Sequence, residues 1–308
     1  MRRLSALIIA VGLLFLACGE SENNVASNVA SAVDARTDTQ GLRDAIKKIE
    51  PFFTPMGKPA AYDWLASHNE PGQTFDEYID SNPTKPTKER QKIYVLPLGT
   101  FTPEQKKIIK ITAGYLEAFY DLPVQQMSSR ALVVTYPNIR QNKFAKTRQI
   151  KTGYVLSNVL KPILPNDAAA LIAFTNEDLY PDETMNYVFG QASMEDRVGV
   201  WSLYRLGEHA DNETFLRRTL KIAAHETGHM FSMHHCTKYE CVMSGTNYLG
   251  ETDRRPIDAC PECMAKICWL SEIAPVARYK RLAEFCRANG LAKDAEEFDR
   301  KARAVGNN

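Results

Sequence analysis

The 308-residue sequence lacks an excess of charge of either sign, because 38 Lys and Arg residues stand against 37 Asp and Glu residues. Proteins that bind nucleic acid or an anionic membrane surface through their overall charge carry a clear basic excess. The balance gives no reason to expect either partner, and we predict no nucleic-acid partner. The sequence also lacks an internal repeat, and its length and 44% hydrophobic content fit one large domain or two small ones.

The sequence also lacks an apolar run long enough for a comfortable membrane-spanning helix, which needs about 20 residues. Its long apolar run, 4–17, follows Arg2 and Arg3 and precedes Cys18, an order typical of a signal peptide. The segment Leu14–Cys18 resembles a bacterial lipobox, which implies a signal peptide over 1–17 and a lipid on Cys18. We therefore expect an exported lipoprotein of the bacterial cell envelope, anchored to a membrane. A signal cleaved without lipidation and a retained anchor are the alternatives.

Residues 19 to about 40 are rich in Ser, Asn, Ala and Asp and lack large apolar side chains. Such a segment cannot bury enough surface to fold alone, so we predict a flexible tether over residues 18–40. A helical pattern starts near Gly41, but prolines interrupt the chain repeatedly from Pro51 onward. We therefore predict a loop-rich N-terminal extension over residues 41–90.

From residue 91 onward the pattern changes to a mixture of strands and helices. It predicts a helix opened by Thr102 and Pro103, a helical segment at 153–164, and strands at 93–96, 131–136, 169–175, 186–190 and 198–204. Two charged helical stretches, 273–288 and 291–304, are separated by Asn289 and Gly290. They predict a C-terminal helical hairpin over residues 271–308.

Four of the six histidines lie within residues 225–235. Since residues 215–224 are compatible with a helix, His225 and His229 are expected one turn apart on the same face, with Glu226 beside them. Two such imidazoles can supply two ligands to zinc, and a catalytic zinc needs a third protein ligand and an open position. We assign the third ligand to His235, with His234 as the alternative. The arrangement predicts hydrolysis of peptide bonds by a zinc-bound water, with Glu226 as the general base.

The longer pattern His-Glu-x-x-His-x-x-Ser-x-x-His-Cys-x-x-x-x-Cys-x-Met, followed later by Cys-x-x-Cys, resembles the archaemetzincin family of zinc peptidases. The resemblance includes segments 178–180, 186–192 and 202–206 and implies an archaemetzincin-like zinc peptidase domain over residues 91–270. The fold it implies is α+β and metzincin-like: a mixed twisted sheet with an active-site helix and Met243 in a turn beneath the metal. With the predicted helices beyond residue 270, a C-terminal helical subdomain completes this fold class.

The resemblance also bears on the substrate and on the turn before His235. It implies an edge strand at 186–192 that pairs with a bound peptide, and an aminopeptidase-like preference in some members. The metzincin pattern has glycine where this chain has Ser232, and serine adopts a left-handed conformation only at a cost. We therefore expect the turn at Ser232 to decide whether His235 or His234 reaches the metal.

Four cysteines form two close pairs, Cys236 with Cys241 and Cys260 with Cys263. Their spacing and the family resemblance predict a closed structural zinc site with four thiolate ligands. We therefore expect two Zn²⁺ ions per chain, one catalytic and one structural. Two disulfides are the alternative, because an oxidising compartment favours them. The remaining Cys268 and Cys286 are expected to be small buried residues.

Two readings of the function remain at this point. The first is an active zinc peptidase that acts on a peptide or protein substrate. The alternative is a catalytically inactive, lipid-anchored zinc protein that binds peptides or partners. Glu226 favours the enzyme, because a binding module has no use for a carboxylate at that position. Arg217 and Arg218 precede the motif and either contact a substrate carboxylate or form a solvated helix face.

Overall fold

The computed structural model describes residues 38–306, and the structural statements below concern that part of the chain. The signal peptide predicted over 1–17, Cys18 and most of the tether predicted over 18–40 lie outside the described residues. Helix α2 (Thr39–Ile49) already includes the last two residues of that predicted tether. Between residues 38 and 306, no helix is both long enough and apolar enough to span a bilayer.

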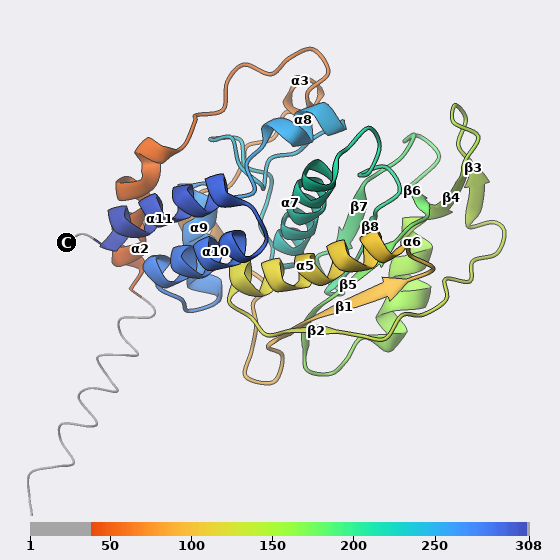
Figure 1. Ribbon diagram of the computed structural model, residues 1–308, viewed down its shortest axis with the longest axis horizontal. Coiled ribbons are helices and arrows are strands. Elements are labelled where there is room, and N and C mark those ends of the chain that lie inside the picture. The colour runs from red at the N-terminus through yellow and green to blue at the C-terminus, as the bar shows by residue number, and fades with distance from the viewer. Residues whose placement is uncertain (1–37, 307–308) are drawn as a thin grey trace, which may run out of the picture. The chain divides into compact units, whose positions relative to one another are not determined.

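A mixed five-stranded sheet lies at the centre of the described residues (Figure 1). Its order is β2 (Val124–Gln126), β1 (Lys92–Leu98), β5 (Ala168–Thr175), β8 (Val198–Ser202) and β7 (Gly190–Ser193). The first four strands are parallel, and β7 runs antiparallel to β8 at one edge. Every residue of β5 is buried, the pattern expected where both faces of parallel strands are covered.

Successive residues of the central strands pack into two different cores. Ile93 and Val95 belong to the core that includes α5 (Pro103–Tyr120) and α7 (Asn212–Met230). Tyr94 and Leu96 belong to a second core formed with α6 (Thr152–Tyr154), the π-helical η2 (Val155–Leu160) and the 3₁₀-helical η3 (Lys161–Ile163). Because side chains alternate across a strand, helical segments cover the sheet on both sides.

The start of α5 confirms the helix predicted at Thr102 and Pro103. The Thr102 hydroxyl accepts from the Gln105 N–H, and the Gln105 side chain accepts from the Thr102 N–H, which completes a capping box. Strand β1, by contrast, continues through Pro97, where the apolar run was expected to end. A strand tolerates proline where no partner needs its missing N–H, and β2 ends its pairing with β1 at Val95.

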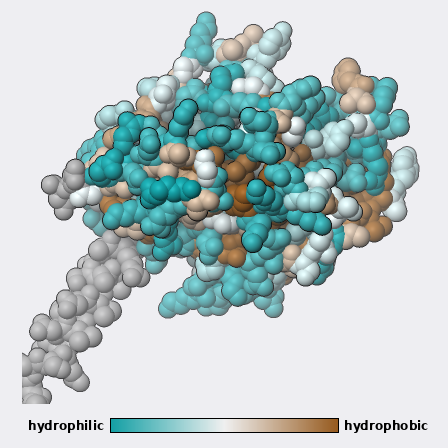
Figure 2. Space-filling view, in the orientation of Figure 1, coloured by the Kyte–Doolittle hydropathy of each residue, from teal (hydrophilic) through white to brown (hydrophobic). Residues whose placement is uncertain are grey.

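A small second sheet contains β3 (Ile139–Gln141), β4 (Arg148–Lys151) and β6 (Asp178–Tyr180). The strand predicted at 131–136 was wrong, because that segment pairs with no strand of the described residues. Its side chains Val133 and Tyr136 are 73% and 88% exposed. On the face of the molecule drawn in Figure 2, hydrophobic residues appear as patches among hydrophilic ones.

The remaining helices come from both ends of the chain. They are α2, η1 (Glu50–Phe52), α3 (Trp64–Ser67), α4 (Phe75–Asp80), α8 (Leu249–Arg254), α9 (Pro261–Leu270), α10 (Pro275–Ala288) and α11 (Ala292–Gly306). The pair α10 and α11 confirms the predicted helical C-terminal part, and with the mixed sheet it makes up the predicted α+β fold. Phe75 and Tyr78 of α4 are buried in the same core as α7, so the extension 41–90 is an integral part of the fold.

Candidate metal centres

Helix α7 carries the first part of the candidate catalytic centre near its C-terminal end. The carboxylate of Asp211 caps the helix by accepting from the Thr214 N–H at 2.8 Å. A Cβ on Gly228 would lie 2.6 Å from the sulfur of Met243. The missing side chain therefore lets Met243 pack directly against the turn of helix that contains His225 and His229.

The turn after α7 takes the sharp form that glycine provides in the metzincin pattern. Ser232 has a left-handed φ of 62°, and its hydroxyl accepts from the Thr84 N–H at 3.0 Å. Gln73 donates to the Ser232 carbonyl at 3.4 Å, and its side-chain oxygen accepts from the His234 N–H at 3.2 Å. These contacts hold the unfavourable conformation and leave the His234 side chain exposed.

The structure brings His225, His229 and His235 together, with their ligand atoms within 4.8 Å of one another. The Nε2 atoms of His225 and His229 are 3.0 Å apart. Nδ1 of His225 faces the Val242 carbonyl at 2.9 Å, and Nδ1 of His229 faces the Met233 carbonyl at 2.7 Å. Nδ1 of His235 faces the Glu70 carboxylate at 2.9 Å.

Those acceptors decide which ring nitrogen of each histidine is free. A carbonyl or an ionised carboxylate cannot donate, so each Nδ1 carries the proton and each Nε2 keeps a lone pair. Three lone pairs then converge on one point, an arrangement that a metal cation satisfies. The geometry of the three histidines therefore fits a zinc ion.

Burial sets the protonation of the groups around this point. It lowers the pKa of His229 to about 4 and, with the neighbouring imidazoles, holds the pKa of His225 well below its usual value. Both rings are therefore neutral at pH 7, which is the form that binds metals. Burial also raises the pKa of Glu226 to about 7, close to the value that suits a general base at neutral pH.

The N-terminal extension contributes residues to this centre that the sequence reasoning missed. The Glu70 carboxylate binds His235 across a sequence separation of 165 residues, and the Trp64 ring meets the His235 ring edge-on at 5.1 Å. Neither residue belongs to a recognisable motif, and a contact across such a separation leaves no periodic signal. Only the folded chain shows that residues 64–73 wrap the third histidine.

A cavity of about 370 Å³ lies beside the histidines. It is lined by Glu226 and the histidines, by the strand β7 and by parts of the segment 242–255. A Cβ on Gly190 would come within 3.4 Å of the Glu226 side chain, so the first residue of β7 adjoins the general-base candidate. The edge strand of the sheet therefore forms one wall of the cavity.

The segment before β7 explains why the strand predicted at 186–190 begins only at Gly190. The Arg140 guanidinium donates to the carbonyls of Met185 at 2.7 Å and Asn186 at 3.1 Å, which occupies backbone groups that a strand would need. Buried Asp178 and half-buried Arg205, from two family-like segments, form an ion pair with contacts of 2.7 and 2.8 Å. The Arg205 guanidinium also lies over the Tyr187 ring, so these motifs support the loop that leads into β7.

Arg217 and Arg218 do not line the cavity. Arg217 pairs with Asp294 and Glu213, and Arg218 pairs with Asp253 at 2.7 Å. Arg218 is also buried, so the solvated helix face considered for both residues does not describe it. Lys221, one helical turn closer to His225, is the basic residue of α7 that lines the cavity.

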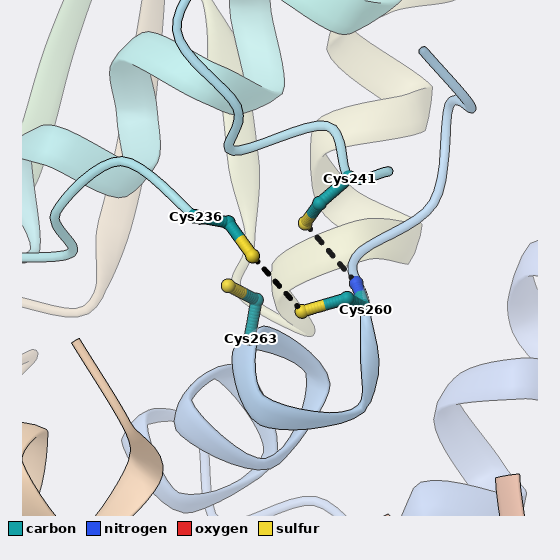
Figure 3. A group of neighbouring side chains, drawn as sticks. All are labelled: Cys236, Cys241, Cys260 and Cys263. Carbon is teal, nitrogen blue, oxygen red and sulfur yellow. Dashed lines mark hydrogen bonds between the residues drawn. The ribbon is translucent and has the colours of Figure 1, made fainter. Parts of the chain in front are cut away.

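The second centre is the cluster of Cys236, Cys241, Cys260 and Cys263 (Figure 3). All four are buried free thiols, and their sulfur atoms lie within 4.8 Å of one another. The backbone N–H of Cys260 donates to the Cys241 sulfur at 3.2 Å. Cys260 is the N-cap residue of α9, and Cys263 lies in its first turn.

This cluster fits a tetrahedral zinc site, because four buried sulfurs converge and none of them is in a disulfide. Its position also ties the catalytic segment to α9, since Cys236 directly follows His235 and Cys241 lies two residues before Met243. Cys268 and Cys286 lie outside the cluster and are buried, as predicted.

Comparison with known proteins gives consistent matches. A family model described as Peptidase family M54 matches residues 143–268. Archaemetzincin-2 of Rattus norvegicus is 31% identical over 279 residues, covering 79% of this chain and 77% of the relative. Archaemetzincin of Archaeoglobus fulgidus is 30% identical over 176 residues, covering 57% of this chain and 98% of the relative. A crystal structure of the archaemetzincin from Archaeoglobus fulgidus, complexed with malonate, is 29% identical, covering 57% of this chain and 99% of that chain, with a TM-score of 0.46.

A histidine trio next to a glutamate, in a cavity walled by the edge of a mixed sheet, is the arrangement of a zinc metallopeptidase. The sequence similarity narrows this class, because the match to the rat protein extends over more than three quarters of both chains. The chain belongs to the archaemetzincin family.

Proposed function

We propose that this protein hydrolyses peptide bonds with a zinc ion held by His225, His229 and His235 and with Glu226 as the general base. The observation that carries the proposal is the convergence of three Nε2 lone pairs in the cavity that Glu226 also lines. Zinc bound there supplies a Lewis acid, which polarises the scissile carbonyl and makes a water molecule more acidic.

Glu226 performs the proton transfers in this proposal. As a carboxylate it takes a proton from the attacking water, and it then passes that proton to the departing amine. Its raised pKa, about 7, lets it act in both directions near neutral pH. The substrate backbone pairs with the free edge of β7 (Gly190–Ser193) by β-augmentation, which brings the scissile bond next to Glu226. An aminopeptidase-like preference for a free amino terminus is part of this proposal.

The second part of the proposal is a structural zinc ion held by Cys236, Cys241, Cys260 and Cys263, which gives two zinc ions per chain. The close approach of four buried sulfurs supports it. Four thiolates leave no open position, so this zinc takes no part in the reaction.

The test of the function is a digest of a peptide library by the purified full-length chain, with the Glu226→Gln variant in parallel. Each peptide is supplied with a free and with an acetylated amino terminus, so that an aminopeptidase is distinguished from an endopeptidase. Removal of zinc by a chelator should stop cleavage, and addition of zinc should restore it. A zinc-loaded protein that binds peptides but cleaves none would support the inactive binding protein instead.

Glu70 is expected to position the third histidine. Replacing Glu70 by Ala should weaken zinc binding at the histidine site about 10- to 100-fold, because a carboxylate that binds the far nitrogen of a ligating histidine fixes its tautomer and orientation. Competition with a chromophoric chelator measures the affinity. The matched control is Glu89→Ala in the same extension, whose carboxylate binds Thr87. Equal zinc affinities of Glu70→Ala and the unmodified chain would contradict this role.

We also propose that the protein is exported and anchored to a membrane of the bacterial cell envelope through a lipid on Cys18. The support is the order of residues 2–18 alone: two arginines, an apolar run and a cysteine. A Cys18→Ser variant should move from the membrane pellet to the soluble fraction and lose the label of a fatty-acid analogue. A variant that stays in the pellet would show that the apolar run itself is retained as the anchor.

A further inference from the structure

Two buried cations line the cavity beside the histidines. They are Lys221 and Arg255, and each side chain belongs to a residue that is only 6% exposed. Lys221 lies on α7 one helical turn before His225, so it faces the same way. Glu226 is the acidic residue among the residues that line the cavity. Apart from the catalytic centre itself, the charge on the cavity wall is therefore positive.

Lys221 has an N–H group to spare. Its ammonium donates to the carbonyls of Thr252 at 2.9 Å and Asp253 at 3.2 Å. These carbonyls lie near the C-terminal end of α8, where the helix dipole favours a cation. An ammonium has three N–H groups, and the third meets no acceptor in the part of the chain that the structure describes. The contacts to α8 hold the charge in place without neutralising it.

Arg255, by contrast, is paired with two carboxylates. One of its terminal nitrogens pairs with Glu240, and the other pairs with Glu251 at 3.2 Å. Neither carboxylate is among the residues that line the cavity. The Arg255 Nε–H has no partner among the described residues, but the nitrogen is fully buried, so a molecule in the cavity does not contact it. Of the two cations, Lys221 is therefore the one with an N–H group to offer to a bound molecule.

We propose that Lys221 forms a carboxylate-binding subsite next to the catalytic centre, so that the enzyme prefers peptides with a carboxylate at or beside the cleaved bond. This inference rests on the proposed peptidase function and names a substrate class for it. The carboxylate belongs to an Asp or Glu side chain or to the C-terminus of a short peptide. One of its oxygens accepts from the spare N–H group of Lys221 in a charge-assisted hydrogen bond. An amide of the same shape carries no charge and leaves the Lys221 ammonium without a counter-charge.

The first experiment compares kcat/KM for matched peptides on the zinc-loaded full-length chain. One pair has Glu or Gln beside the cleaved bond and an amidated C-terminus, and a second pair has Gln there with a free or an amidated C-terminus. The acid should be preferred about tenfold or more in at least one pair. A preference in the first pair assigns the carboxylate to an acidic side chain, and a preference in the second pair assigns it to the C-terminus. Cleavage of all three peptides at equal kcat/KM would overturn the subsite and leave the peptidase function intact.

The second experiment uses the Lys221→Met variant, and its readout is the ratio of kcat/KM for the acid to that for the amide. Both values come from one preparation, so the ratio does not depend on the fraction of folded enzyme. It should fall towards one, whereas Lys280→Met, at an exposed position of α10, should keep the original ratio. A Lys221→Met variant with the full preference would overturn the assignment.

Binding separates the subsite from the chemistry. Calorimetry with the zinc-loaded Glu226→Gln variant should show tighter binding of the acidic peptide than of its amide partner. This result would support the subsite even if no peptide were cleaved by the unmodified chain, in which case the proposed function alone would fail. Equal affinities for the two peptides would count against the subsite.

Discussion

Replacing Glu226 by Gln is expected to lower kcat for peptide hydrolysis by about 10²- to 10⁴-fold, the usual contribution of a general base. The amide has nearly the shape of the carboxylate, but it cannot take the proton from the attacking water. Because the proposed zinc ligands are the three converging histidines and not Glu226, the variant should bind the same amount of zinc as the unmodified chain. Zinc per chain and kcat, measured on the same preparation, check both expectations.

The matched control for that variant is Glu213→Gln, on the same helix. Glu213 is exposed and pairs with Arg217 near the start of α7, so its replacement should leave kcat unchanged. Undiminished cleavage by the Glu226→Gln variant would refute the proposed mechanism. A loss of zinc in that variant would show instead that the carboxylate is needed to build the site.

Replacing Cys263 by Ala is expected to remove one of the two proposed zinc ions and to prevent stable folding. A structural zinc contributes about 10–16 kcal/mol of apparent binding free energy in zinc-finger peptides, whereas a whole domain is stable by only about 5–15 kcal/mol. The cluster also fixes the segment that follows His235, so any folded remainder should lose activity. Zinc content and the melting temperature measure the effect.

The control is Cys286→Ala on α10, because it also removes a buried thiol but leaves the cluster intact. It should keep two zinc ions and lose stability of only about 1 kcal/mol from the small cavity.

If too little soluble Cys263→Ala protein is obtained, zinc removal from the unmodified chain serves instead. Zinc removal should then lower the melting temperature and expose four additional thiols. Cysteines that stay unreactive after zinc removal would favour disulfides. A Cys263→Ala variant with two zinc ions and an unchanged melting temperature would rule out the thiolate site.

The first two histidines show why part of the site was predictable from the sequence. Their spacing reflects the helix itself, in which residues four apart lie on one face, and α7 places His225 and His229 accordingly. The pairing of Cys236 with Cys241 and of Cys260 with Cys263 is similarly local, since each pair is separated by only a few residues. The capping box at Thr102 is a third case. In each, the interaction lies within a few residues, so the sequence pattern and the physical contact coincide.

The strand that was predicted wrongly and the turn that the sequence left open have the opposite property. The run at 131–136 has the composition of a strand, yet a strand needs a partner to satisfy its backbone groups, and no nearby residue determines whether one is present. The left-handed turn at Ser232 depends on contacts from Gln73 and Thr84, far away in the chain. Glycine was therefore not required there, because distant residues hold the conformation that serine disfavours.

The sequence by itself determined the chemistry available to this protein: the helix with His225, Glu226 and His229, the paired cysteines and the α+β class. These features follow from local periodicity and from residue types. The tertiary structure bears out the predicted His235, rather than the alternative His234, as the third histidine of the trio. It alone decided that Glu70 binds His235 and that β7 and the cations Lys221 and Arg255 wall the cavity. Such contacts join residues that are distant along the chain, and they form only when burial of apolar surface brings the sheet and its helices together.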